Sequence, residues 1–115
     1  MCRSSVSVGK YEVYKDLIKY AETPYKITEG KINDFVNDME PFMDHKYYIT
    51  LEKYEIMWDY KSMMIMEVDK IFNVDCILAL LTGVIRMERF SEGTLKEFFE
   101  SRRISEWIKR LEDIL

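Results

Sequence analysis

The stretch that decides the fold runs from Asp75 to Gly93 and reads DCILALLTGVIRMERFSEG. Its apolar residues recur every three or four positions, which is the spacing of one face of an α-helix. This apolar face is broad and consists of Ile77, Leu78, Leu80, Leu81, Val84 and Ile85. A face of this width is typical of a helix that is buried on most sides. We therefore predict a central apolar helix near residues 75–90, with Asp75 as its N-terminal cap.

Two helices are predicted before the central one. The first covers residues 10–21 and ends before Pro24, because the residue that precedes a proline disfavours the α region. The second covers residues 32–39; Thr28 can cap it, and Pro41 ends or kinks it. The expected inward residues of both helices are Tyr11, Tyr14, Leu17, Ile18, Ala21, Ile32, Phe35, Val36 and Met39.

The chain between Pro41 and the central helix is less regular. Asp44 can cap a third helix, although the aromatic and β-branched residues 47–50 leave a short strand as an alternative. The inward face of this helix would consist of Tyr48, Leu51, Tyr54 or Ile56, and Trp58. Residues 63–72 begin with four consecutive apolar side chains and then resume a helical rhythm, so we favour a helix there.

After Gly93, a capping box predicts the start of another helix. In Thr94-Leu95-Lys96-Glu97, the threonine hydroxyl and the glutamate carboxylate can each accept a hydrogen bond from the other residue's backbone N–H. A break near Ser101–Arg102 separates this helix from a last one, which runs to the C-terminus. The inward residues of the two helices would be Leu95, Phe98, Phe99, Ile104, Trp107, Ile108, Leu111 and Leu115.

The composition agrees with an all-α domain. Glycine (4) and proline (2) are too scarce for the many turns of a β-sandwich or barrel. The predicted fold class is all-α, a compact single-domain bundle of five to six helices around the central helix, with one short β element as the alternative. We expect the domain to span residues 10–115, because residues 1–9 are small and polar and suit a disordered or expression-derived leader.

Charge limits the choice of partners. The chain carries 17 Lys and Arg against 21 Asp and Glu, a net charge of −4, so no overall basic field attracts nucleic acid directly. Acidic side chains gather between residues 29 and 59, and the candidate partner-binding acidic face consists of Asp34, Asp38, Glu40, Asp44, Glu52, Glu55 and Asp59. Such a face can imitate a nucleic-acid backbone and occupy a basic groove on a protein. A solvated helix face is the alternative interpretation.

No residue pattern points to catalysis, a metal or a cofactor. The single histidine, His45, has no second ligand at metal-binding spacing, so we expect it at the surface. Cys2 and Cys76 do not form a disulfide framework, and Cys76 is expected in the core. The longest apolar run, residues 76–81, is too short to span a bilayer, and no signal peptide precedes it. We therefore expect a cytoplasmic protein that does not contact membranes.

Two groups of charged residues allow a structural and a functional interpretation. Arg86, Glu88 and Arg89 follow the apolar helix where its last carbonyls need partners, so we favour a buried structural ion network over an anion or substrate site. In the last helix we expect intrahelical ion pairs rather than phosphate binding for the four basic residues, which are Arg102, Arg103, Lys109 and Arg110.

Methionine and aromatic residues are dense between Met57 and Met66. Such residues fill irregular cores, and they also form adaptable binding surfaces. We favour core packing, because large exposed apolar patches are uncommon on soluble monomers. A subunit interface of a homo-oligomer is the alternative.

The stretch L-L-T-x-x-I-R-x-E-R-F-x-x-G resembles the C-terminal half of an uncharacterised family of small bacterial and prophage proteins, a domain of unknown function. The matching residues are Leu80, Leu81, Thr82, Ile85, Arg86, Glu88, Arg89, Phe90 and Gly93. The resemblance is weaker over residues 10–75 and continues through the final helix, where the family often has a glycine turn in place of Ser101–Arg102. It implies a fold unit and a mobile-element setting, and no particular activity.

Three functional hypotheses follow from these patterns. The leading one is a non-enzymatic protein-interaction module, such as a phage or mobile-element inhibitor, that presents its acidic face to a basic, nucleic-acid-binding site on a partner protein. The second is a small ligand-binding or hydrolytic domain that uses Arg86, Glu88 and Arg89. The third is a helical homo-oligomer with a structural role.

Overall fold

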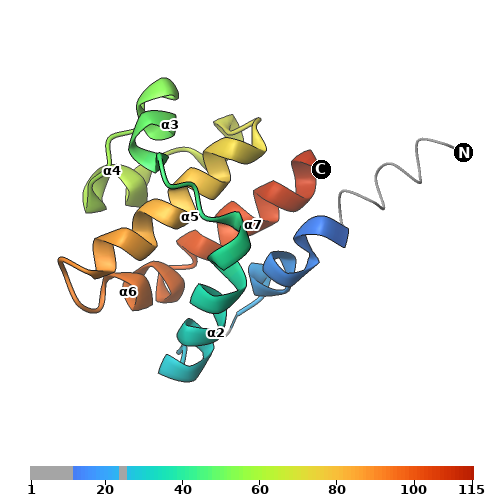
Figure 1. The fold of residues 1–115 in the computed structure, drawn as a ribbon, viewed down its shortest axis with the longest axis vertical. Coiled ribbons are helices and arrows are strands. Elements are labelled where there is room, and N and C mark those ends of the chain that lie inside the picture. The colour runs from blue at the N-terminus through green and yellow to red at the C-terminus, as the bar shows by residue number, and fades with distance from the viewer. Residues whose placement is uncertain (1–11, 24–25) are drawn as a thin grey trace, which may run out of the picture.

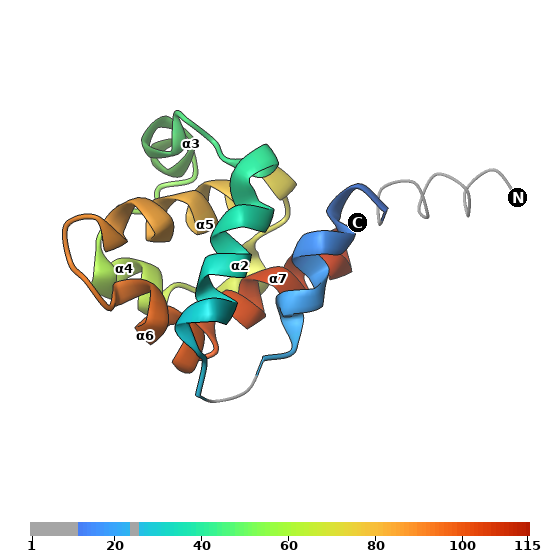
Figure 2. The same ribbon diagram turned by 60° about the horizontal axis from the view of Figure 1, so that its bottom comes forward.

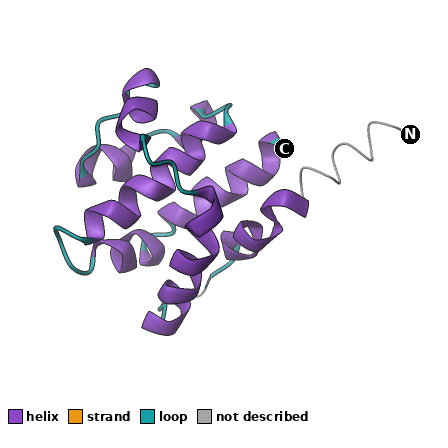
Figure 3. Cartoon of the chain, in the orientation of Figure 1, coloured by secondary structure: helices purple, strands orange, loops and turns teal. Residues whose placement is uncertain are grey.

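The computed structural model describes residues 12–23 and 26–115, and the regular structure within them is helical (Figure 3). Residues 12–18 form a helix that continues into the 3₁₀-helix η1 (Lys19–Ala21). The chain then forms α2 (Glu29–Met39), η2 (Glu40–Phe42), α3 (Tyr47–Lys53), α4 (Tyr60–Ile65), η3 (Val68–Lys70), α5 (Val74–Glu88), α6 (Thr94–Glu100) and α7 (Arg103–Ile114). The predicted all-α class is confirmed. The predicted leader, residues 1–9, and Tyr11 lie outside the described residues.

Helix α5 is the centre of the domain, as its broad apolar face predicts. Helices α3, α6 and α7 pack against it, and Figure 1 shows it running diagonally between α3 and α7. Its side chains Ile77, Leu80, Leu81 and Val84 have no exposed surface. Burial of each such side chain contributes on the order of 1.5–3 kcal/mol, so this helix supplies a large share of the driving force for folding.

The first helical segment and α2 complete the core from the N-terminal part of the chain. Tyr20 and Phe35 meet edge to face with ring centroids 5.2 Å apart, and Phe35 meets Phe99 of α6 in the same way at 5.0 Å. Segment η1 packs on α7, and the two lie side by side in Figures 1 and 2. The hydroxyl of Tyr20 donates to Asp38 at 2.6 Å, so a hydrogen bond also joins this segment to α2.

Some predicted helix ends are confirmed and others are wrong. Thr28 caps α2, since its hydroxyl oxygen accepts from the N–H of Lys31, and α2 ends two residues before Pro41. Asp44 accepts from the N–H of Lys46, but Lys46 is itself the cap residue of α3. Asp75 does not cap α5, because the helix already begins at Val74; its carboxylate accepts from the hydroxyl of Tyr54 at 2.8 Å instead.

Residues 47–72 differ most from the prediction. The helix favoured over residues 47–50 is confirmed, but Tyr48, expected to point inward, is 55% exposed, and the buried residue of α3 is Leu51. The helix expected over 63–72 is wrong: α4 ends at Ile65, and the chain turns through the short η3 before α5.

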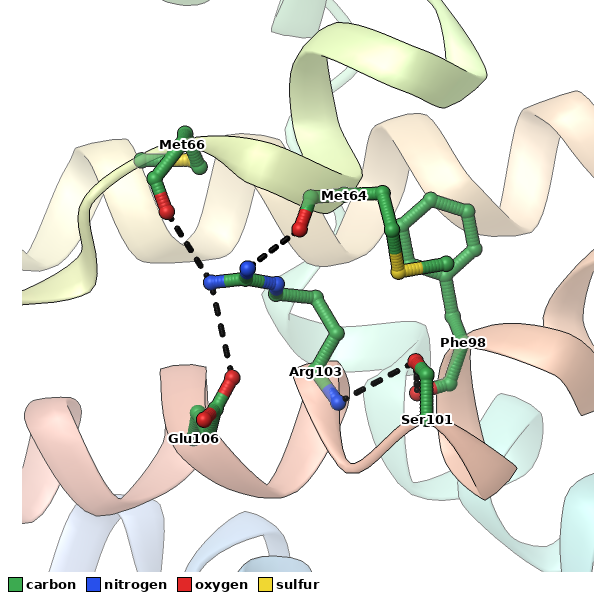
Figure 4. Close-up of polar contacts among 6 residues, drawn as sticks. All are labelled: Met64, Met66, Phe98, Ser101, Arg103 and Glu106. Atoms are coloured by element: carbon green, nitrogen blue, oxygen red, sulfur yellow. Dashed lines mark hydrogen bonds and ion pairs between the residues drawn. The ribbon is translucent and has the colours of Figure 1, made fainter.

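Arginines of α7 explain why residues 63–72 are not one helix. The guanidinium of Arg103 donates to the carbonyl oxygens of Met64 and Met66 and lies 3.4 Å from a carboxylate oxygen of Glu106 (Figure 4). Arg110 donates to the carbonyl oxygens of Ile71, at 2.7 Å, and Asp69, at 3.2 Å. These carbonyls are therefore satisfied by another helix rather than by the next turn of their own. Of the predicted intrahelical ion pairs, the one between Arg103 and Glu106 is present.

Candidate functional site

Trp58 occupies a fixed place on the surface of α5. Its indole N–H donates to the carbonyl oxygen of Gly83 at 2.8 Å. The absence of a side chain at Gly83 makes this approach feasible, since a Cβ atom there would lie 3.1 Å from Trp58 Cδ1. The glycine inside a long apolar helix is thus explained by the close approach of another side chain. The Trp58 side chain is half-buried and lines the surface on two sides.

Two surface grooves meet at Trp58. The α3 groove has a volume of about 350 Å³ and is lined by Tyr48, Glu52, Glu55, Ile56, Met57 and Trp58. The α5–α6 groove has a volume of about 420 Å³ and is lined by Trp58, Asp59, Tyr60, Met87, Phe90, Ser91, Thr94 and Glu97. Figures 1 and 2 both show α4 and the turn between α5 and α6 on the same side of the molecule. We call the two grooves together the Trp58 face.

Large apolar side chains on the Trp58 face are exposed. Phe90 is 81% exposed, Met57 69% and Tyr48 55%. The rings form a chain of contacts, with centroids 5.2 Å apart between Tyr47 and Trp58 and 6.3 Å apart between Trp58 and Phe90. An apolar surface that gathers in one place on a small domain marks a site of interaction rather than scattered surface variation. The expectation that Met57 to Met66 packs in the core is therefore only partly right: Met63 is buried, whereas Met57 faces solvent.

The rim of the Trp58 face is acidic. Its lining residues include four carboxylates and no lysine or arginine: Glu52, Glu55, Asp59 and Glu97. Asp59 caps α4, and the hydrogen bond from the backbone N–H of Ser62 lowers the pKa of this carboxyl group below its ordinary value. The hydrogen bond to Glu97 raises the pKa of the Tyr60 hydroxyl. At neutral pH the apolar centre is therefore bordered by negative charge.

The seven acidic residues singled out in the sequence differ in their surroundings. Asp38 is bound to Tyr20 and Lys19, and Asp44 accepts from Lys46 and Thr50 within its own segment. Among the other five, Asp34 and Glu40 are exposed on α2 and η2, whereas the groove-lining acids are Glu52, Glu55 and Asp59. This last group lines the same grooves as the exposed side chains of Tyr48, Met57 and Phe90.

Glu88 has a backbone role that the sequence pattern concealed. One carboxylate oxygen accepts from the N–H of Gly93 at 3.0 Å and the other from the N–H of Leu95 at 2.8 Å. Gly93, with φ of +93°, is the cap residue of α6, so the Thr94–Glu97 capping box is wrong. The hydroxyl of Thr94 donates to the carbonyl oxygen of Ser91 instead. Glu88 displaces the box because it reaches the first amides of α6 from the end of α5.

The predicted ion network of Arg86, Glu88 and Arg89 is absent from the ion pairs that join the described residues. Arg86 is half-buried and Arg89 is exposed, and the hollow that Glu88 borders is lined by neither arginine. Its rim contains Glu29, Glu92 and Lys96. The structure therefore separates the three residues: Glu88 holds the turn that carries Phe90, and the arginines do not join it.

Another pocket, of about 400 Å³, lies between the α3–α4 connection and the start of α5. It is lined by apolar residues that include Tyr54, Ile71, Phe72 and Cys76. Burial raises the pKa of the Cys76 thiol to about 11, which agrees with the expected core position of this residue. The charges at the rim offset one another, because Lys70 forms an ion pair with Glu67 at 2.9 Å. This pocket therefore lacks the one-sided charge of the Trp58 face.

These observations define an all-helical domain with a carboxylate-rimmed aromatic face and, in the part of the chain that the structure describes, no cluster of three metal-ligating side chains. The chain belongs to DUF6508, a family of unknown function, whose model matches residues 57–115. The expected membership of a family of unknown function is thereby confirmed. No curated protein and no solved structure matches the chain.

The family match covers one groove completely and the other in part. Every residue that lines the α5–α6 groove lies within residues 57–115, whereas the α3 groove also uses residues from Tyr48 to Ile56. None of the helices among residues 12–23 and 26–115 is long and apolar enough to cross a membrane. His45 is exposed, as expected.

The sequence pattern does not indicate the Trp58 face as a whole, because its residues come from separate segments of the chain. It allows a binding surface between Met57 and Met66 only as the alternative to core packing, and it places Phe90 only in the motif. One signal was available: a glycine in the middle of an otherwise apolar helix indicates that something approaches the backbone closely. Gly83 was in that position, and Trp58 is the side chain that approaches it.

Proposed function

We propose that the chain is a non-enzymatic protein-interaction module that binds a basic surface of a partner protein through the Trp58 face. The observation that supports this most directly is the lining of the two grooves, in which exposed aromatic and methionine side chains lie beside charged residues that are all carboxylates. Aromatic residues and methionine are enriched at the centres of protein interfaces. A negative rim attracts a positive partner and excludes acidic ones.

The same charge pattern suits an inhibitor. A module of this kind would cover the nucleic-acid-binding site of its partner, because such sites are basic and carry aromatic or apolar side chains between their lysines and arginines. The proposal includes a phage or mobile-element role and action in the cytoplasm, both of which rest on the sequence patterns described above.

The other two hypotheses have less support from the structure. A ligand-binding or hydrolytic site at Arg86, Glu88 and Arg89 would need Glu88, whose two carboxylate oxygens already accept hydrogen bonds from the backbone. A homo-oligomer through Met57 to Met66 would place the acidic rims of two copies against each other, which is unfavourable where like charges meet.

Capture of a partner with paired charge-reversal variants tests the proposal. The first variant, E52K/E55K, reverses the rim of the α3 groove, and the matched control, D34K/E40K, reverses two exposed acids outside the Trp58 face. We expect the wild-type chain and D34K/E40K to retain a basic protein from a bacterial lysate at low salt, and E52K/E55K to lose it. High salt should weaken retention, because exposed charges are screened beyond about 8–10 Å.

Two outcomes would overturn the proposal. Equal retention of the partner by both variants would show that the rim charges do not select it. Retention that is unchanged between low and high salt would exclude electrostatic attraction as the source of binding. Sedimentation of the purified wild-type chain gives an independent readout, since a dimer that dissociates on Phe90→Ala substitution would assign the Trp58 face to self-association instead.

A further inference from the structure

We infer that the partner presents an amphipathic α-helix to the Trp58 face, with apolar side chains that enter both grooves and lysine or arginine side chains beside them. This inference rests on the proposed function and names the kind of segment that the face accepts. It is carried by the shape of the face, by the helical architecture around it and by the distribution of charge.

The shape of the face calls for two apolar anchors on one segment. The α3 groove and the α5–α6 groove share Trp58 as a common wall, so a segment that lies across this ring reaches both. A helix that lies across this ring presents apolar side chains three, four and seven positions apart along one face, so one segment can supply an anchor to each groove.

The surrounding architecture favours a helix over an extended peptide. An extended peptide binds best when it adds a strand to the edge of a sheet, because its backbone groups then find partners. The described residues contain no strand, so the Trp58 face has no such edge. A helix satisfies its own backbone hydrogen bonds and needs only side-chain contacts from the groove.

The charges select a basic helix. Glu52 and Glu55 border one groove, and Asp59 and Glu97 border the other, so negative charge flanks the apolar anchors at both ends of the face. Lysine or arginine on the two edges of a bound helix would meet these carboxylates, whereas an acidic helix of the same apolar pattern would be repelled.

The face is already held in a fixed shape. The Trp58 indole is anchored to Gly83, and the turn that carries Phe90 is held by the two hydrogen bonds from Gly93 and Leu95 to Glu88. A site that is preorganised in this way loses less conformational freedom on binding.

Synthetic peptides test the inference with the 115-residue chain. The probe is a fluorescein-labelled helical peptide of Lys, Leu and Ala, about 16 residues or roughly four turns long, with its leucines on one face. A second peptide has the same composition with the leucines spread around the helix, and a third has Glu in place of Lys. Fluorescence anisotropy measures binding. We expect the dissociation constants of the second and third peptides to be at least about tenfold higher than that of the probe.

Matched variants locate the binding site of the probe. Phe90→Ala and E52K/E55K should each weaken binding of the probe at least about tenfold. Phe72→Ala removes a ring that is 71% exposed but lines a different pocket, and D34K/E40K reverses charge elsewhere, so both controls should bind as the wild type does. A circular-dichroism spectrum of each variant confirms that its helices are intact.

The results separate this inference from the proposed function. Equal binding of the probe and the peptide with scattered leucines would overturn the amphipathic helix, while leaving a basic partner for the Trp58 face. Capture of a basic protein by the wild-type chain without measurable binding of the probe would also overturn the amphipathic helix and leave the basic partner in place. Loss of probe binding in D34K/E40K or Phe72→Ala to the same extent as in E52K/E55K or Phe90→Ala would overturn the placement on the Trp58 face.

Discussion

Glu88 shows how one side chain can determine the path of the chain over several residues. It ends α5, and its carboxylate accepts from two backbone N–H groups at the start of α6. A carboxylate in this place is favourable because the N-terminus of a helix carries partial positive charge. The sequence pattern predicts that Thr94 and Glu97 cap α6, but in the structure Glu88 accepts the hydrogen bonds from its first amides. Local capping rules could not detect a cap that lies outside the helix's own first turn.

Substitution of Glu88 tests this role. We expect Glu88→Ala to lower the free energy of unfolding by roughly 2 kcal/mol, because two amides at a helix start lose a charged acceptor. Glu88→Gln should lose less, since its single carbonyl oxygen still accepts. Urea unfolding gives the values. Arg89→Ala is the control; as an exposed side chain it should change stability by less than about 0.5 kcal/mol. Equal losses of stability in Glu88→Ala and Arg89→Ala would contradict this role and support the predicted ion network instead.

At the scale of elements, apolar periodicity predicted the helices around α5, α6 and α7 and most of their buried residues. It failed between residues 63 and 72, where the side chains are apolar enough for a helix. The arginines of α7 bind the carbonyls of this segment from a distance of about 40 positions along the chain. A pattern confined to neighbouring residues does not contain that information, which is why tertiary contacts can override helix propensity.

Arg110 tests the strength of these tethers. Its guanidinium donates to two carbonyl oxygens and also lies over the ring of Phe72, with its central carbon 5.1 Å from the ring centroid. Arg110→Lys keeps the charge but removes the planar guanidinium group. We therefore expect the free energy of unfolding to fall by about 1–2 kcal/mol and the amides of residues 66–73 to exchange hydrogen faster. Lys109→Gln, which removes only an exposed ion pair with Glu22, should leave exchange there unchanged. Unchanged hydrogen exchange in Arg110→Lys would show that the segment keeps its structure without the hydrogen bonds from the guanidinium group.

The contact between η1 and α2 makes stability depend on pH. The hydrogen bond from Tyr20, and then the nearby Lys19, lowers the pKa of Asp38 below its ordinary value of 3.8. A lowered pKa in the folded state means that the charged carboxylate stabilises the fold. This contribution is complete above pH 3.8 and is lost as the pH falls from there through the pKa of the folded state.

Asp38→Asn measures that contribution. At pH 7 we expect the variant to be less stable by about 1 kcal/mol, because a charge-assisted hydrogen bond becomes a neutral one. The difference from the wild type should shrink as the pH falls below 3.8, since the wild type then loses its own charge. Urea unfolding between pH 2.5 and pH 7 gives the comparison, with Asp34→Asn as the control for net charge. A difference that stays constant down to the lowest pH would contradict this account.

At the scale of the whole molecule, the family match and the folding unit do not coincide. Residues 57–115 contain α4 to α7, but the aromatic cluster at Phe99 is completed by Tyr20 and Phe35. These two side chains are almost fully buried, as are Leu17, Met39 and Leu51. Removal of the N-terminal half would therefore expose one side of the core.

A fragment of residues 57–115 tests this dependence. A chain of about 60 residues buries a smaller share of its surface than a larger domain and is marginally stable even with an intact core. We expect the fragment to lack cooperative unfolding in urea and to bind a hydrophobic dye, and we expect the 115-residue chain to unfold in one transition. A sigmoidal unfolding curve for the fragment would show that the matched segment is an independent domain, and that the N-terminal helices are an addition to it.

The arginines of α7 hold their neighbours by backbone carbonyls, which every residue type supplies. The segment from Met64 to Ile71 can therefore change its exposed side chains, such as Ile65, Glu67 and Asp69, without losing its anchor, whereas α7 must keep its arginines. In this segment the path of the backbone does not depend on the identity of the exposed side chains. These side chains can therefore diverge in evolution while the segment keeps the same path.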